Sequence, residues 1–252
     1  MNIKFLSLAS SITTFFLPFQ AGAVPMDKYN PVVFNMAQLY DFNPVKGNVK
    51  HVKSVVYNKD GSINYESDLK IAKDGCIESF SMTRTKDEYI NSVHNELSVK
   101  REKNKLIGQD SNGPVEMEIG NNCLILSKKD SDGKLTYQYN ADGFINSSWV
   151  AEPKTKLSAF HYDENNRSYN VSYYNDNKLF SEISVRYTSD ETKPYDLILE
   201  VKVLDQSVLT VDTQCEYNQQ GVSHKCQFVL TLISDGKQIT LKKHSTTDAS
   251  FY

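Results

Sequence analysis

The residues of this sequence that are most able to do chemistry are four cysteines: Cys76, Cys123, Cys215 and Cys226. Cysteines can pair as disulfides or hold a zinc ion, for which His224 would be a further ligand. Zinc is the weaker interpretation because no C-x-x-C pair is present. The even number of cysteines predicts two disulfides, provided that the chain is exported to an oxidising compartment.

The spacing of the two C-terminal cysteines favours one pairing. Cys215 and Cys226 lie symmetrically about Gln220-Gly221, so a hairpin with a two- or four-residue loop would set them opposite each other. A three-residue loop would put them out of register by one residue and would need a further bulge. By elimination, Cys76 is expected to bond Cys123.

Other chemical motifs are weak. The sequence contains no G-x-S-x-G, no H-E-x-x-H and no phosphate-binding glycine loop, and its five histidines are isolated. The S-x-x-K matches at 131–134 and 234–237 span expected tight turns, where Ser and Lys would not share a helical face. Asp130 and Asp132 suggest calcium, but the later acidic ligand of a full site is missing. No catalytic residue, metal ligand or cofactor site is therefore predicted.

The elements that must position the cysteines read as strands joined by tight turns. The motif Tyr-Asn-x-x-Gly occurs at 57–61, 139–143 and 217–221, and a type I turn favours Asn or Asp first and Gly fourth. The tyrosine is expected to pack its ring across the hairpin and to direct its hydroxyl to water. Further turns are expected at 74–75, 130–133, 163–166, 175–177 and 235–236.

The segments between these turns alternate apolar and polar residues and are rich in β-branched and aromatic types. This pattern predicts an all-β protein: an antiparallel sheet of successive hairpins, forming a meander, with a sandwich-like or curled form as alternatives. At most a short N-terminal helix is expected. Asn30 could cap it and Pro31 suits its first position, although an extended arm is the alternative. Either would cover one end or face of the sheet.

The N-terminus has the layout of a secretory signal. Lys4 is followed by an apolar run over 5–19 and by small residues at 21–23. We expect a signal peptide at 1–23, with a retained anchor as the alternative, and a single β domain at 24–252. The mature protein would be soluble, in the periplasm or secreted, after cleavage near Ala23. No cysteine precedes Cys76, so a lipid-modified N-terminus is excluded chemically.

Charge and the C-terminal strand exclude two classes of protein. The formal net charge is −3, with 28 basic and 31 acidic residues spread along the chain, which gives no case for nucleic acid or anionic membrane as partners. An outer-membrane barrel strand needs a lipid-facing apolar row. Neither alternating row of the terminal segment 243–252 is apolar, so a membrane barrel is rejected.

Three segments resemble a known family. YDFNPVKGNVK at 40–50, DGCIESFSM at 74–82 and QCEYNQQGVSHKCQF at 214–228 look like the YnfC family of cell-envelope lipoproteins from Gram-negative bacteria. All four cysteines fall where that family places its own, which supports the pairing. This chain has Ala-Gly-Ala-Val-Pro in place of the lipobox cysteine, so membrane tethering does not carry over. The resemblance implies a compartment and an architecture, but no particular activity.

Two functional hypotheses follow. The favoured one is a non-enzymatic cell-envelope protein with a binding or structural role in the periplasm, whose sheet surface binds an envelope protein or polymer. The alternative is a secreted hydrolase or carbohydrate-active enzyme with dispersed carboxylates. It requires a cleft in which two acidic side chains lie roughly 5–10 Å apart.

Overall fold

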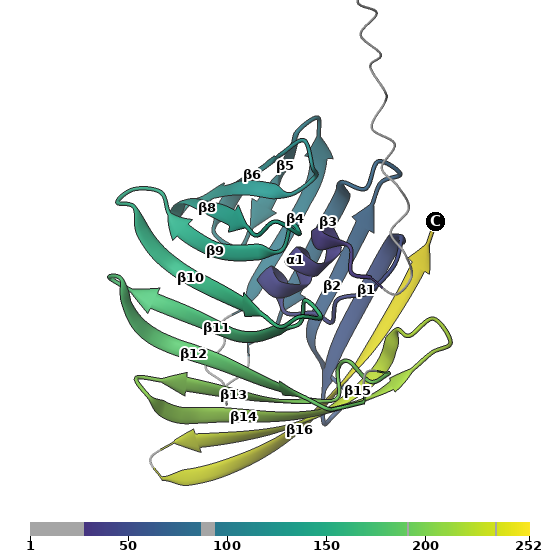
Figure 1. Ribbon diagram of the computed structural model, residues 1–252, viewed down its shortest axis with the longest axis vertical. Coiled ribbons are helices and arrows are strands. Elements are labelled where there is room, and N and C mark those ends of the chain that lie inside the picture. Colours follow the sequence, from purple (N-terminus) through teal and green to yellow (C-terminus); the bar gives the residue numbers. More distant parts are fainter. Residues whose placement is uncertain (1–27, 87–93, 191, 235) are drawn as a thin grey trace, which may run out of the picture.

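A computed structural model describes residues 28–86, 94–190, 192–234 and 236–252; the predicted signal peptide at 1–23 lies outside them. Within these residues the chain forms one helix, α1 (Pro31–Tyr40), and sixteen strands (Figure 1). The strands are β1 (Val49–Asn58), β2 (Ile63–Ile71), β3 (Ile77–Arg84), β4 (Asn95–Glu102), β5 (Lys105–Asp110), β6 (Gly113–Ile119), β7 (Ile125–Asp130), β8 (Gly133–Tyr139), β9 (Ile145–Val150), β10 (Thr155–Tyr162), β11 (Ser168–Asn175), β12 (Lys178–Tyr187), β13 (Leu197–Val203), β14 (Gln206–Tyr217), β15 (Ser223–Ser234) and β16 (Lys237–Phe251).

The strands form a closed barrel. Each strand pairs antiparallel with the next along the chain, and β16 pairs with β1 in a register from Val49↔Phe251 to Asn58↔Lys243. The all-β prediction is confirmed, but the prediction of an open meander or a sandwich is wrong. The physical reason is that period-two alternation defines strands and their faces locally. Closure depends on strand tilt and stagger, and on pairing between the two ends of the strand series.

Six hairpins of the described chain share one turn geometry. In the turn of β14 and β15, the amide of Gly221 donates to the carbonyl of Asn218 at 2.9 Å, and that of Asn218 to the carbonyl of Val222 at 3.0 Å. The fourth turn position has a positive φ in every case. Cys123 and Asn166 take this position in two of the turns, and glycine takes it in the other four. The expected Tyr-Asn-x-x-Gly turns are therefore confirmed.

The same turn sets the register of the C-terminal cysteines. Its loop has three residues, and a bulge between Glu216 and Tyr217 restores the register, so that Cys215 lies opposite Cys226. The two are joined by a disulfide, as are Cys76 and Cys123, which are 47 residues apart in sequence. The pairing is the one expected from spacing, reached through the three-residue loop with its further bulge.

The antiparallel order assigns each turn to one of two barrel ends. We call them the plug rim, with turns at 72–76, 120–124, 140–144, 163–167 and 218–222, and the distal rim, with turns at 59–62, 111–112, 131–132, 176–177 and 204–205. The helix begins at the plug rim. The Asn35 side chain donates to the carbonyl of Gly143 at 2.9 Å and accepts from the amide of Ile145 at 2.8 Å.

The helix predicted from Asn30 and Pro31 is confirmed. The Asn30 side chain accepts a hydrogen bond from the amide of Val32 at 2.9 Å, and Pro31 occupies the first turn. The helix lies inside the barrel, against the inner face of the sheet (Figure 1). Val33 and Met36 are 0% and 1% exposed.

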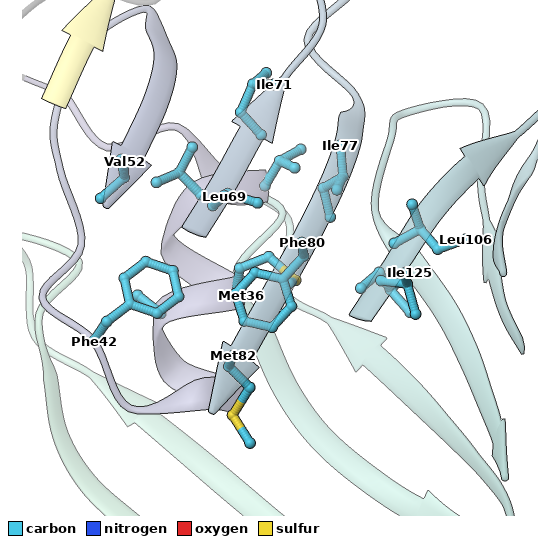
Figure 2. Packing of buried hydrophobic residues seen from close by; sticks show 14 of the residues in the cluster. Met36, Phe42, Val52, Leu69, Ile71, Ile77, Phe80, Met82, Leu106 and Ile125 are labelled. Atoms are coloured by element: carbon cyan, nitrogen blue, oxygen red, sulfur yellow. The ribbon is translucent and has the colours of Figure 1, made fainter. Parts of the chain in front are cut away.

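The core forms where this helix meets the inner face of the barrel. Met36 faces Phe80 of β3, and Leu69 of β2 and Leu106 of β5 complete the packing around them (Figure 2). Burying each such side chain contributes about 1.5–3 kcal/mol. The helix therefore covers one half of the barrel interior.

The outer wall is polar along the same strands. Between neighbouring strands Lys53 pairs with Glu66 at 2.7 Å, and Lys105 pairs with Glu116 at 2.8 Å. Because side chains alternate across a strand, the apolar row faces the lumen and the charged row faces outward. In the described part of the chain, no helix has the length and apolar character needed to cross a membrane.

Candidate functional site

The other half of the barrel interior is not filled by the helix. A cavity of about 280 Å³ lies between α1, the segment that follows it, and the inner faces of β10–β15. Its strand lining is mainly apolar: Phe160, Ser168, Val171, Tyr173, Ile183, Val185, Tyr187, Leu197, Leu199, Val211, Thr213 and Phe228.

Strand alternation explains why these residues face the cavity. Leu199 of β13 lies between Val185 and Val211 on the neighbouring strands, and all three are only partly buried. The intervening Glu200 and Lys202 point outward and approach each other at 3.9 Å. The apolar row thus faces the cavity, whereas the equivalent row on β2 and β3 is covered by α1.

The cavity is closed toward the plug rim by tyrosines. Tyr29 and Tyr195 share a hydrogen bond at 2.9 Å between their hydroxyls, and the Tyr187 hydroxyl donates to the carbonyl of Ser168 at 2.8 Å. Burial raises the pKa of all three hydroxyls, so they stay neutral. The Arg167 guanidinium lies 4.6 Å from the centre of the Tyr187 ring. Arg167 also pairs with Asp163 at 2.8 Å, so this end of the cavity offers phenol groups and one ion-paired guanidinium.

The segment after α1 forms the roof of the cavity, and the second disulfide holds it. Phe42 is 8% exposed, and the Asn43 side chain donates to the sulfur of Cys226 and to the hydroxyl of Ser223, both at 3.3 Å. The disulfide between Cys215 and Cys226 therefore positions one wall of the cavity, although it was predicted only as a structural link.

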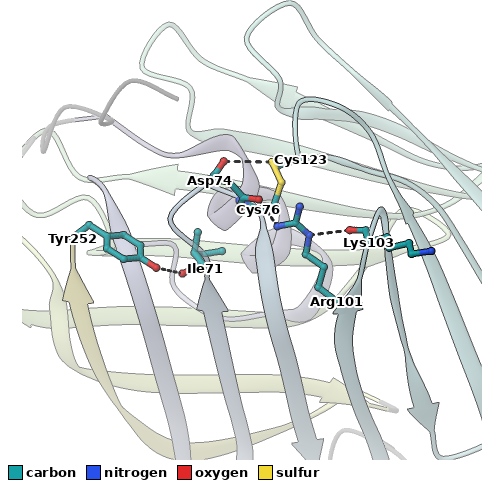
Figure 3. A network of polar contacts seen from close by, with 7 residues as sticks. All are labelled: Ile71, Asp74, Cys76, Arg101, Lys103, Cys123 and Tyr252. Atoms are coloured by element: carbon teal, nitrogen blue, oxygen red, sulfur yellow. Dashed lines mark hydrogen bonds and ion pairs between the residues drawn. A yellow bond between two sulfur atoms is a disulfide. The ribbon is translucent and has the colours of Figure 1, made fainter. Parts of the chain in front are cut away.

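The first disulfide lies away from the cavity, among polar contacts at the plug rim (Figure 3). It joins the turn of β2 and β3 to that of β6 and β7. Arg101 pairs with Asp74 at 2.6 Å, and the Tyr252 hydroxyl donates to the carbonyl of Ile71 at 2.7 Å. This network fixes the rim and contains no catalytic arrangement.

A second, polar cleft of about 460 Å³ lies near the distal rim, between the end of α1 and strands β3, β4, β5 and β7. It gathers four carboxylates, from Asp41, Asp110, Asp130 and Asp132. Arg84 pairs with Asp41 at 2.7 Å. Lys128 pairs with Asp130, also at 2.7 Å, and both side chains are largely buried. The alternative hydrolase hypothesis anticipated a cleft of this kind but named no residues. Asp130 and Asp132, considered above for calcium, lie in one turn, whereas Asp41 and Asp110 reach them from the end of α1 and from β5.

The remaining sequence motifs do not form sites. Lys134 of the first S-x-x-K match pairs with Glu118 on the outer wall at 3.3 Å, away from any serine nucleophile arrangement. The second match includes Ser234, whose side chain lies outside the described residues. Among the residues that the structure describes, no group of three His, Cys, Asp or Glu side chains could hold a metal ion.

Fold and lumen define an all-β barrel with an internal helix and an apolar cavity. The chain belongs to the uncharacterised protein family UPF0257, whose model matches residues 11–252. No curated protein matches the sequence. Among solved structures, the chain is similar to a porin-like protein from Bacteroides uniformis, with 9% identity, a TM-score of 0.40 and coverage of 80% of this chain and 96% of that one. MucB in complex with MucA(peri) is less similar, with 10% identity, a TM-score of 0.14 and coverage of 79% and 88%.

Proposed function

We propose that the protein is a non-enzymatic, exported envelope protein whose barrel lumen binds an elongated apolar ligand such as an acyl chain. The observation that carries the proposal is the row of partly exposed apolar side chains around the 280 Å³ cavity. Ligand sites are typically concave and mostly apolar, with a few polar groups that fix orientation. Here the tyrosine hydroxyls and Arg167 would meet a polar end group.

Simple energetics favour such a ligand. Burying one methylene contributes about 0.8 kcal/mol, so about ten methylenes contribute ~8 kcal/mol. This is the scale of a micromolar dissociation constant, before the costs of ordering are subtracted. A polar ligand would gain less, since the strand lining offers few hydrogen-bonding groups beyond the plug rim.

The polar outer wall favours a barrel that is surrounded by water and not by lipid. A lipid-facing wall needs an apolar band about 25 Å tall. The ion pair of Lys53 and Glu66 lies between strands β1 and β2, where such a band would be. The signal-like N-terminus, the two disulfides and the family resemblance support export to the periplasm or beyond.

The test is binding of a fluorescent fatty acid, cis-parinaric acid, to the purified protein with its disulfides intact. We expect a micromolar dissociation constant. The variant Leu199→Trp would fill the cavity and weaken binding at least tenfold. Ile198→Trp adds the same ring on the outer face of the same strand, where Ile198 is 36% exposed, and should bind as the wild type does. Equal binding by the two variants would refute the lumen as the site.

A further inference from the structure

The hairpin of β13 and β14 ends in an unusual turn. Its two turn residues, Leu204 and Asp205, have φ of 48° and 62°, in the left-handed region. Two-residue turns of this type favour Asn, Asp and Gly, because other side chains are strained there. Leu204 is also 68% exposed. Leu204 thus exposes a large apolar side chain to water at the tip of a turn. Its backbone also takes a conformation that is unfavourable for leucine.

The neighbouring hairpin extends this apolar surface. Leu179 and Phe180, at the start of β12, are 47% and 45% exposed. The amide of Leu204 donates to the carbonyl of Phe180 at 3.0 Å, so the two hairpin tips are in contact. Both tips lie at the left edge of the view in Figure 1. We call Leu179, Phe180 and Leu204 the apolar tip.

Two aromatic rings, each with a lysine ammonium packed against it, lie on the same rim. The Lys156 ammonium lies 4.9 Å from the centre of the Tyr174 ring, and the Lys154 ammonium lies 5.6 Å from the Trp149 ring. The amide of Lys156 donates to the side chain of Asn177 at 3.2 Å, which joins this group to the hairpin of β11 and β12. Trp and Tyr favour the membrane–water interface, and long lysine side chains reach toward lipid phosphates.

We propose that the apolar tip docks on the surface of a phospholipid bilayer that contains anionic lipid. Its apolar side chains would enter the interface while Lys154 and Lys156 meet the headgroups. The overall charge of the chain gives no reason to expect this. Asp176 and Asp205 are exposed in the same two hairpin turns, so the local attraction is set by Lys154 and Lys156 acting against these two carboxylates. The docking site and the lumen are built from the same hairpins, since β12 and β13 contribute Ile183 and Leu199 to the cavity wall. The idea that the lumen takes its ligand from the bilayer rests on the proposed function. The docking itself does not.

The test is co-sedimentation of the full mature chain with vesicles of phosphatidylethanolamine and phosphatidylglycerol. We expect Leu204→Asn to weaken vesicle binding about tenfold, since one large apolar side chain no longer enters the interface. Its melting temperature should rise, because Asn tolerates the left-handed conformation better. Ile107→Asn is the matched control: Ile107 is 38% exposed on β5, away from the tip, and its loss should leave vesicle binding unchanged.

Several outcomes would overturn the proposal. Wild-type protein that does not bind vesicles, or Leu204→Asn that binds as well as wild type, would do so. A dimer that Leu204→Asn turns into a monomer, with no vesicle binding by either, would assign the tip to a second copy of the chain instead. Binding of cis-parinaric acid in solution should be the same in Leu204→Asn and wild type. If wild type binds vesicles but not this probe, docking stands and only the proposed function falls.

Discussion

The Tyr162 hydroxyl donates a hydrogen bond to the backbone carbonyl of Ile145 at 2.6 Å, linking the end of β10 to the start of β9. Tyr187, at the end of β12, makes the corresponding bond to Ser168 at the start of β11. Tyr139, at the end of β8, bonds the first residue of β7 in the same way. These tyrosines fasten successive hairpins at the plug rim. The expectation that the hydroxyl of the turn tyrosines reaches water is wrong for Tyr139. It is also wrong for Tyr217, whose hydroxyl accepts from the amide of Tyr195 at 2.9 Å and donates to the carboxylate of Asp196 at 3.2 Å.

Removing one of these hydroxyls should destabilise the barrel. Tyr162→Phe leaves the Ile145 carbonyl without its partner, and we expect the free energy of unfolding to fall by about 1–2 kcal/mol. Urea denaturation measures the change. Tyr169→Phe removes a hydroxyl from a side chain that is 47% exposed and should change stability by less than about 0.5 kcal/mol. Equal losses would show that the bond contributes nothing specific.

The buried tyrosines predict alkaline unfolding. Burial raises the pKa of Tyr173 to about 12 and moves the pKa values of Tyr139, Tyr162 and Tyr187 upward as well. The unfolded chain loses these protons near pH 10 while the folded barrel retains them, so stability is full below pH 10 and falls as pH rises above it. Circular dichroism and phenolate absorbance, followed together from pH 8 to 12, should show a shared transition. Full ionisation of a still folded barrel would contradict the prediction.

One glycine is required by close backbone approach. A Cβ on Gly108 would lie 1.8 Å from the backbone oxygen of Ser98 on the paired strand. Gly108→Ala should therefore prevent folding, or cost more than about 3 kcal/mol, because backbone cannot move as a flexible side chain can. The matched control is Gly120→Ala, whose Cβ would meet only side-chain atoms, the nearest at 3.1 Å. Expression yield and thermal melting of the two variants decide the matter, and a soluble, stable Gly108→Ala would refute the clash.

The two disulfides should differ in their effects. In the loop-entropy account, removing the link between Cys215 and Cys226 costs roughly 3 kcal/mol, and removing the longer-range link between Cys76 and Cys123 costs roughly 4 kcal/mol. Double alanine variants, compared by urea denaturation, test this order. Loss of the link between Cys215 and Cys226 should weaken cis-parinaric acid binding more than loss of the other link does, because Cys226 contacts the roof of the cavity through Asn43. Unchanged binding after loss of the second link would separate that disulfide from the site.

Local features were predictable to the extent that local physics decides them. Asn30 and Pro31 predicted the helix, and the Asn-x-x-Gly motifs predicted the turns, because capping and left-handed φ are properties of a few adjacent residues. The cysteine pairing followed from a hairpin for the same reason. The loop type could not be settled, since the bulge beside Tyr217 has no signature of its own.

The candidate site could not be predicted, because the cavity forms only when the sheet closes into a barrel. Leu199 and Val185 read as the buried face of an ordinary sheet, and nothing in their alternation says that the space before them stays empty. Among the described residues, α1 is the helix that enters the barrel, and it covers only the inner faces nearest to it. In the distal cleft, likewise, the turn that carries Asp130 and Asp132 meets Asp110 of β5 and Asp41 after α1 only in the folded barrel.

The pairing of β1 with β16 has a consequence for how the chain folds during its synthesis. Until the ribosome has made β16, β1 lacks one of its two partner strands, so the cylinder cannot seal during synthesis. Contacts of such high sequence separation form slowly. A nascent chain of this fold therefore stays open until its last strand is complete, which is the state that the proposed export through a membrane pore would require.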